Sequence, residues 1–72
     1  SRLAPMPGSI VRVAVAEGDE VVVGQPLMWL EAMKMQHQIN APVTGTITEV
    51  DVTEQRQVEV GVVLAVVAEE NS

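Results

Sequence analysis

The sequence lacks cysteine and has a single histidine, His37. Without thiols, neither a disulfide framework nor a thiolate metal site can support the fold, and one imidazole excludes a histidine-rich metal site. Phe and Tyr are also absent, which leaves Trp29 as the only aromatic residue. No apolar run approaches the roughly 20 residues that span a bilayer as a helix, so we expect no membrane-spanning segment.

Basic residues are scarce as well. Four Lys and Arg residues stand against ten Asp and Glu residues, which gives a formal net charge of −6. Such a chain is poorly suited to follow nucleic-acid phosphates or an anionic membrane surface, so we expect neither as a partner. Only one of the four basic residues is a lysine, Lys34.

What the chain has instead is valine, at 15 of its 72 residues. Valine is stiff at its first side-chain torsion and packs well on a pleated surface, so it favours strands. Gly and Pro recur every few positions and leave short segments between turns, which predicts an all-β fold. Residues 1–72 have room for one domain. Because the chain begins without Met or a secretory signal, we expect it to be a segment of a larger protein.

An internal repeat relates residues 4–33 to residues 41–70 by a shift of 37 positions without a gap. Eleven positions are identical, where about three would be expected by chance. They are Ala4/Ala41, Pro5/Pro42, Gly8/Gly45, Ile10/Ile47, Val13/Val50, Val15/Val52, Glu17/Glu54, Val21/Val58, Val23/Val60, Gly24/Gly61 and Leu27/Leu64. Neither half can bury its apolar face alone, so we expect two similar halves, each of about four short strands, to form a flattened β-barrel or sandwich with pseudo-two-fold symmetry.

The repeat also predicts the core from its apolar positions. These are Val13, Val15, Val21, Val23, Leu27, Val50, Val52, Val58, Val60 and Leu64. Ile10 and Ile47 have the opposite parity, and a bend or bulge after each would reconcile them with the same inward face. Trp29 lies in the continuously apolar run of residues 27–30, so we place it in the core. We expect His37 to be a structural or solvated residue.

Lys34 lies where the two halves join, three residues after the run of residues 27–30. A hairpin turn there would push its side chain away from the body, and a primary amine on a flexible stem suits the attachment of a swinging group. The alternative is an ordinary solvated lysine. Two methionines beside it, Met33 and Met35, are unexpected at a purely solvated tip, because exposed methionine suits contact with several partners.

The segment Glu31-Ala32-Met33-Lys34-Met35 resembles the biotin attachment motif of biotin carboxyl carrier domains, a biotinyl/lipoyl attachment family. The segment Ala4-Pro5-Met6-Pro7-Gly8 resembles that family's entry strand, and Ala41-Pro42 followed by Gly45 resembles the entry of its second half. Gly18-Asp19 with Val21 and Gly24-Gln25 with Leu27 resemble its next two turns. The resemblance covers about residues 3–68. It implies a barrel-sandwich hybrid, a flattened barrel of two four-stranded antiparallel sheets with the lysine on a tight hairpin turn. It also implies covalent biotin on Lys34, attached by a biotin protein ligase, with Glu31, Ala32, Met33 and Met35 completing the motif.

The resemblance further implies a carrier that is not catalytic alone, because biotin performs the chemistry and the protein supplies orientation and transport. Such carriers move a carboxyl group from a biotin carboxylase site to a carboxyltransferase site, where an acyl-CoA or another small acceptor receives it. The loop at residues 16–21 is too short for the protruding thumb of some bacterial carriers. The chain is therefore more similar to the carrier domains of acyl-CoA or pyruvate carboxylases. We expect it to be the C-terminal piece of a larger carboxylase, in the cytoplasm or, in a eukaryote, the mitochondrial matrix.

Two alternatives stay open. One is a lipoyl carrier domain, whose lysine usually follows an acidic residue and precedes a small one, and the other is a non-enzymatic hybrid-barrel module for assembly or transport. At single residues, Glu31 is either a solvated hairpin residue or one that positions the turn or contacts the ligase. Trp29 has the lesser alternative of a stacking platform for biotin, and His37 that of contact with the ligase or an enzyme site. Gln55-Arg56 departs from the family pattern, because it stands where the first half has Gly18-Asp19. If that turn needs a left-handed residue, Gln55 is strained there.

Overall fold

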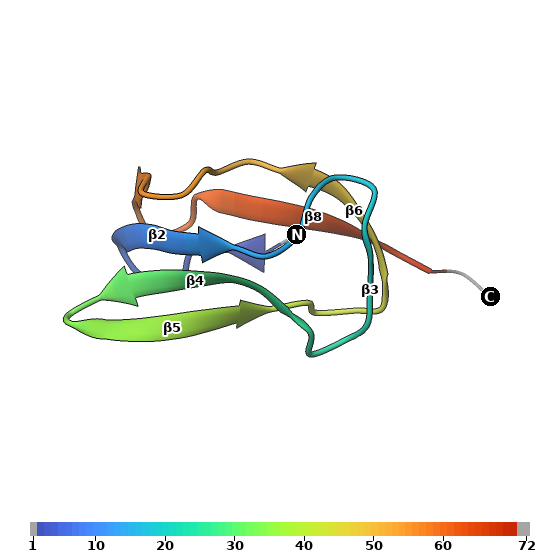
Figure 1. Cartoon of the computed structure of the whole chain (residues 1–72), viewed down its shortest axis with the longest axis horizontal. Helices are drawn as coiled ribbons and strands as arrows, with labels where there is room; N and C mark the ends of the chain where they lie inside the picture. The colour runs from blue at the N-terminus through green and yellow to red at the C-terminus, as the bar shows by residue number, and fades with distance from the viewer. Residues whose placement is uncertain (1, 71–72) are drawn as a thin grey trace.

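A computed structural model describes residues 2–70 as eight strands in two antiparallel sheets (Figure 1). The strands are β1 (Arg2–Leu3), β2 (Gly8–Val13), β3 (Glu20–Val21), β4 (Pro26–Ala32), β5 (Met35–Asn40), β6 (Gly45–Val50), β7 (Gln57–Val58) and β8 (Val63–Glu69). One sheet has the order β1-β8-β6-β3 and the other the order β5-β4-β2-β7. The predicted fold class is confirmed. Ser1, Asn71 and Ser72, which end the predicted domain, lie outside the described residues.

The molecule is elongated, with extents of 40 × 19 × 18 Å. The β4–β5 hairpin forms one end of the long axis, and β3 lies with the C-terminal end of β8 at the other end (Figure 1). Within the described residues there is no helix with the length and hydropathy that a membrane crossing requires.

The repeat of the sequence is also a repeat of the hydrogen bonding. A shift of 37 residues carries β2, β3 and β4 onto β6, β7 and β8. The same shift relates the bond from Ala14 N–H to the Leu27 carbonyl, 2.9 Å long, to the bond from Asp51 N–H to the Leu64 carbonyl, 3.0 Å long. The pseudo-two-fold symmetry predicted from the repeat is therefore present in the backbone.

The two halves interlock rather than lie side by side. β3 leaves the first half to pair with β6, and β7 leaves the second half to pair with β2. Further bonds tie the halves together, such as Gly18 N–H to the Ile47 carbonyl at 2.8 Å and Gln55 N–H to the Ile10 carbonyl at 2.6 Å. Each sheet thus contains strands of both halves, and neither half can complete its backbone hydrogen bonds alone.

The predicted bend after each isoleucine is a β-bulge. The register of β2 against β4 shifts between Ile10 and Arg12, and the register of β6 against β8 shifts between Ile47 and Glu49. An extra residue on one strand reverses the parity of the side chains that follow. Both isoleucines are consequently fully buried, and the prediction is confirmed.

The predicted core is half right. Five of its residues are buried: Val21, Leu27, Val52, Val58 and Leu64. Three more are partly buried and pack against the core: Val13, Val15 and Val50. The core also holds side chains that the repeat alone did not assign to it, the largest being Met28, Leu30 and Ile39.

The prediction that Val23 and Val60 are core residues was wrong, because they are 63% and 65% exposed. β3 ends at Val21, so the alternation of inward and outward side chains does not continue to Val23. Val23 instead lies in a turn closed by the bond from Gln25 N–H to the Val22 carbonyl, at 3.0 Å. Gly24 follows with a φ of 85°, as a type II turn requires at that position. The same turn, shifted by 37 residues, exposes Val60.

The prediction that Trp29 lies in the core was also wrong. The register of β4 against β5 shifts between Pro26 and Met28, so Leu27 and Met28 both face inward and are fully buried. Trp29 therefore faces outward and is half-buried. It pairs with Arg12 across β2 and β4, and the Arg12 Cζ lies 5.4 Å from the centroid of its ring. This is the geometry of a cation–π contact.

Gln55 has a φ of 71°, which is the left-handed conformation that the comparison of the halves called into question. Its repeat equivalent is Gly18, with a φ of 93°. The two turns are closed by equivalent bonds, Asp19 N–H to the Ala16 carbonyl at 3.1 Å and Arg56 N–H to the Thr53 carbonyl at 3.2 Å. The second half thus keeps the turn while placing a side chain where glycine is favoured.

We expect the corrected core to appear in stability measurements. Ile10→Val and Ile47→Val should each lower the free energy of unfolding by about 0.5–1.5 kcal/mol, because each removes one buried methyl group. Val23→Ala and Val60→Ala should change it by less than about 0.5 kcal/mol, because both side chains are exposed. Urea denaturation compares the four variants. A loss at Val23 as large as the loss at Ile10 would contradict the turn described above.

The left-handed turn in the second half gives a second prediction. Gln55→Gly should raise the free energy of unfolding by about 0.5–1 kcal/mol, because glycine adopts a positive φ without steric cost. Gly18→Ala, the matched change in the first half, should lower it by about 1 kcal/mol. The same denaturation assay measures both. A destabilised Gln55→Gly variant would mean that the Gln55 side chain stabilises the turn by more than its backbone strain costs.

Candidate functional site

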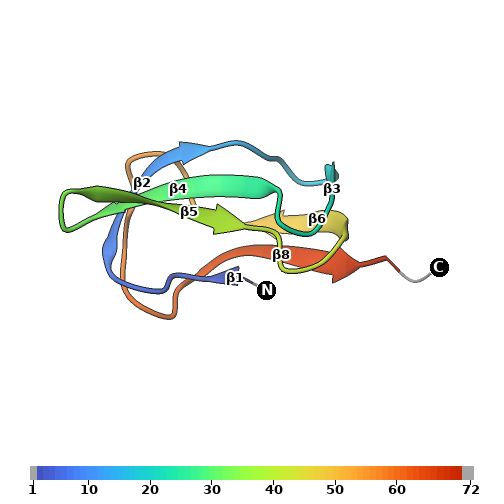
Figure 2. The same ribbon diagram turned by 90° about the horizontal axis from the view of Figure 1, so that it is seen from below.

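The predicted attachment lysine lies at the tip of the β4–β5 hairpin. Ala32 pairs with Met35, and Met33 and Lys34 are the only residues between them. Both have positive φ values, 53° and 65°, which defines a type I′ turn. The hairpin extends beyond the other loops at its end of the molecule (Figure 2), so the turn projects into solvent.

The turn is made from residues that do not favour it. Type I′ turns prefer Asn-Gly because both central residues are left-handed, whereas here they are Met and Lys. A non-glycine residue in that conformation costs on the order of 1–3 kcal/mol. A strained turn that persists at an exposed tip points to a requirement for these two side chains rather than for stability.

The base of the hairpin is fixed while its tip is open. Ala32 is 6% exposed. A Cβ atom added at Gly8 of β2 would collide with the Glu31 carbonyl oxygen and would lie 3.2 Å from the Ala32 Cβ, so β2 and β4 are in close contact there. Met33, by contrast, is 91% exposed and Met35 is 63% exposed. Lys34 and Glu31 are exposed as well. The structure therefore gathers all five predicted motif residues on one hairpin and buries only the alanine.

His37 lies on β5, opposite Leu30 of β4. Paired residues of neighbouring strands share a face, so its side chain is on the same side of the sheet as the core. It is half-buried, and it is separated from the turn by Met35 and Gln36.

Sequence reasoning missed a row of side chains on the outer face of the sheet that carries Lys34. Arg12, Trp29 and Gln38 lie side by side on β2, β4 and β5. We call these three residues the Trp29 row. A signal for it existed in the repeat, since Trp29 and Arg12 correspond to Val66 and Glu49 and break the match between the halves.

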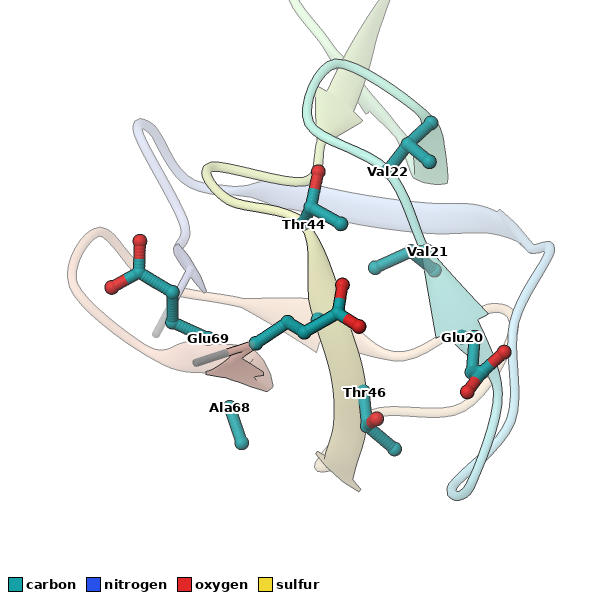
Figure 3. Close-up of a pocket in the computed structure, with 9 residues that line it drawn as sticks. Glu20, Val21, Val22, Thr44, Thr46, Ala68 and Glu69 are labelled. Carbon is teal, nitrogen blue, oxygen red and sulfur yellow. The ribbon is translucent and has the colours of Figure 1, made fainter. Parts of the chain in front are cut away.

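A cavity of about 510 Å³ lies between β3, β6 and β8 (Figure 3), at the end of the molecule that Figure 1 shows opposite the hairpin. Its walls come from β3, β6 and β8 and the segments beside them: Glu20, Val21, Val22, Thr44, Gly45, Thr46, Ala68, Glu69 and Glu70. Its charged residues are acidic. None of the five predicted motif residues lines this cavity, because the motif lies at the tip of the hairpin.

Known proteins share both the sequence and the fold of this chain. Residues 3–67 match the family described as "Biotin-requiring enzyme". The chain is 48% identical over 56 residues to the mitochondrial pyruvate carboxylase of Mus musculus, a match that covers 78% of this chain and 5% of that protein. It is 48% identical over 58 residues to the biotin carboxyl carrier protein of Streptococcus mutans, covering 81% of this chain and 45% of that protein.

A solved structure of a single-chain, multi-domain long-chain acyl-CoA carboxylase gives a TM-score of 0.89 at 37% identity, covering 97% of this chain and 7% of the other. The chain thus spans only a small part of the enzymes that it matches. The family inferred from the motif is confirmed: the chain belongs to the biotin-requiring enzyme family and is a biotin carrier domain.

Proposed function

We propose that biotin is joined to Nζ of Lys34 and that this domain carries a carboxyl group between the biotin carboxylase and carboxyltransferase sites of a biotin-dependent carboxylase. The observation that carries the proposal is the position of the only lysine, on an exposed two-residue turn at the tip of the hairpin. The residues at the tip of the hairpin are suited to hold a covalently attached biotin. The Lys34 amine projects from the end of the molecule, where it is open to a ligase and to a deep active site.

Each motif residue has a physical role in this proposal. The left-handed pair Met33 and Lys34 narrows the hairpin to two residues, which makes the tip slender. Ala32 and Gly8 hold the base of the hairpin against β2, so the tip has a fixed origin. Met33 and Met35 give the tip two flexible apolar side chains, which suit contact with a ligase and with two different enzyme sites. Glu31 places a carboxylate beside them.

Attachment is an acyl transfer to the Lys34 amine. The neutral nitrogen attacks an activated biotinyl carboxylate, a C–N bond forms, the activating group leaves and the amine loses a proton. The amide has no charge, so the formal charge of the chain falls from −6 to −7. When bound, biotin supplies the ureido nitrogen that accepts the carboxyl group. The protein residues then orient and transport it, as a compact body with a radius of gyration of 11.5 Å.

The parent enzyme remains a proposal as well. We infer that the domain is the C-terminal piece of a larger carboxylase, modified by a biotin protein ligase, and that it works in the cytoplasm or the mitochondrial matrix. Proteins named as pyruvate, acyl-CoA and urea carboxylases contain a segment similar to this chain, which supports a domain architecture shared by carboxylases of different acceptors. Selection of the acceptor then belongs to the carboxyltransferase. Tethering to that enzyme raises the effective concentration of the carried group at each site.

The attachment site is tested by intact-mass measurement after co-expression with a biotin protein ligase. We expect one biotinyl group on the chain and none on the Lys34→Arg variant, which keeps the positive charge but has no amine that the ligase can acylate. A thermal melt of the variant should match that of the parent chain, because Lys34 is exposed. A lipoyl group on Lys34 would replace this proposal with the lipoyl alternative, and an unmodified chain would end both.

The strained turn gives a separate prediction. Met33→Asn should raise the free energy of unfolding by about 0.5–1 kcal/mol, because Asn tolerates the left-handed conformation. The same variant should be biotinylated about tenfold more slowly, because the ligase loses an apolar contact at the tip. Initial rates of biotin incorporation and urea denaturation measure the two effects. If biotinylation proceeds at the rate of the parent chain, the Met33 side chain is not read by the ligase.

A further inference from the structure

We propose that the outer face of the β5-β4-β2-β7 sheet is a resting site for the biotinyl group of Lys34, with the Trp29 row as its platform. The proposal rests on the attachment of biotin to Lys34. It assigns a function to Arg12, Trp29 and Gln38, three side chains that stand outside the attachment motif and outside the core.

The row is not required by the fold. At the equivalent positions of the other sheet, Glu49 replaces Arg12 and Val66 replaces Trp29. The bulge, the strand order and the pairing are nevertheless the same in both halves. The second half thus shows that the architecture forms without an aromatic–cation pair on its outer face. The pair occurs only on the sheet that carries the lysine.

The side chains of the Trp29 row match the two fused rings of biotin, the thioether ring and the ureido ring. Trp29 is half-buried on an outward face, and the part of its indole that Arg12 does not cover, including the ring edge, can make favourable sulfur–aromatic contact with a thioether ring. The Arg12 guanidinium, already held at 5.4 Å from the indole centroid, can donate hydrogen bonds to the ureido carbonyl.

Gln38 supplies the complementary acceptor. Its Nε2 donates to Asn40 Oδ1 at 2.8 Å, which fixes the amide and leaves Oε1 able to accept a bond from a ureido N–H. The hydrogen-bond donor of Arg12, the apolar surface of Trp29 and the acceptor of Gln38 therefore lie in one line across β2, β4 and β5. This line is perpendicular to β4, the strand that leads to Lys34. The planar ureido ring of biotin carries a carbonyl flanked by two N–H groups, so it can accept a hydrogen bond from Arg12 and donate one to Gln38 while the thioether ring contacts Trp29.

The tether is long enough to reach the row. Between the Lys34 Cα and the bicyclic ring lie about eleven bonds, which span about 14 Å when extended. From Ala32 back to Trp29, β4 covers about 10 Å at roughly 3.3 Å per residue. The distance from the turn to Ala32 is short, so an extended arm that folds back along β4 can place the ring over Trp29. On the way the alkyl arm crosses Glu31 and Gln36, which pair on the same outer face.

A resting site of this kind would keep the ring off the solvent between visits to the two enzyme sites. The outer face is open to solvent, so binding of the biotinyl ring to it is reversible. The biotinyl arm leaves this face when a deeper enzyme site offers more contact. The site acts on the free carrier, so it is measurable in the 72-residue chain without the carboxylase.

The single tryptophan allows a direct test by acrylamide quenching of its fluorescence. Unmodified and fully biotinylated chains are compared, with complete modification verified by intact mass. We expect biotinylation to lower the quenching constant of Trp29 roughly twofold, because a ring that occupies the platform half of the time halves the accessible population. Arg12→Gln should remove most of that protection while leaving biotinylation complete.

The pseudo-symmetry provides the control. The double variant Trp29→Val with Val66→Trp moves the only tryptophan to the equivalent position on the other sheet, and biotinylation should leave its quenching unchanged. An equal quenching constant for modified and unmodified parent chains would overturn the resting site, as would equal protection in the double variant. Neither result touches the attachment of biotin to Lys34, whereas a mass spectrum without biotin would remove both proposals.

Discussion

The interlocking of the two halves is the constraint on which the rest of the structure depends. β3 and β7 are two residues long and pair with the half that they do not belong to. Such short strands have little stability of their own, so they form only when both halves are in place. The exchange closes a small core of aliphatic side chains and Met28 without a disulfide, since the chain has no cysteine, and without a large aromatic residue among the buried side chains. A chain of 72 residues gains its stability in this way from symmetry rather than from size.

The two ends of the molecule differ because the hairpin that joins the two repeats lies at only one of them. In the first half, β4 continues through the turn into β5, and this hairpin joins the repeats. At the related place in the second half, β8 reaches Glu69, beside a cavity whose charged residues are acidic. The connection between the repeats is thus the place where the chain leaves the symmetric body. The lysine, its two neighbouring methionines and the left-handed turn that Met33 and Lys34 form are all found there.

Much of the fold could be predicted from the sequence, because the repeat indicates both the two halves and which side chains face inward. Eleven matched positions were enough to predict two halves, and the parity of Ile10 and Ile47 was enough to predict the bulges. The errors have two separate causes. Val23 and Val60 match across the halves because both lie in the same turn, and a repeated residue need not be a buried one. Trp29 was misplaced because a second register shift allowed Leu27 and Met28 to face inward together. The motif predicted the place of Lys34, but only the backbone reveals that two left-handed residues form its turn.

The central claim is that the single lysine at the tip of this symmetric body carries biotin, and a tryptic peptide map of the chain isolated from cells with a biotin protein ligase tests it most directly. Trypsin cleaves after Arg12, Lys34 and Arg56, but an acylated Lys34 has no charge and is not cleaved. We predict one peptide of residues 13–56 that contains a single biotinyl group on Lys34. Unmodified peptides of residues 13–34 and 35–56, with biotin absent or at another residue, would contradict the account.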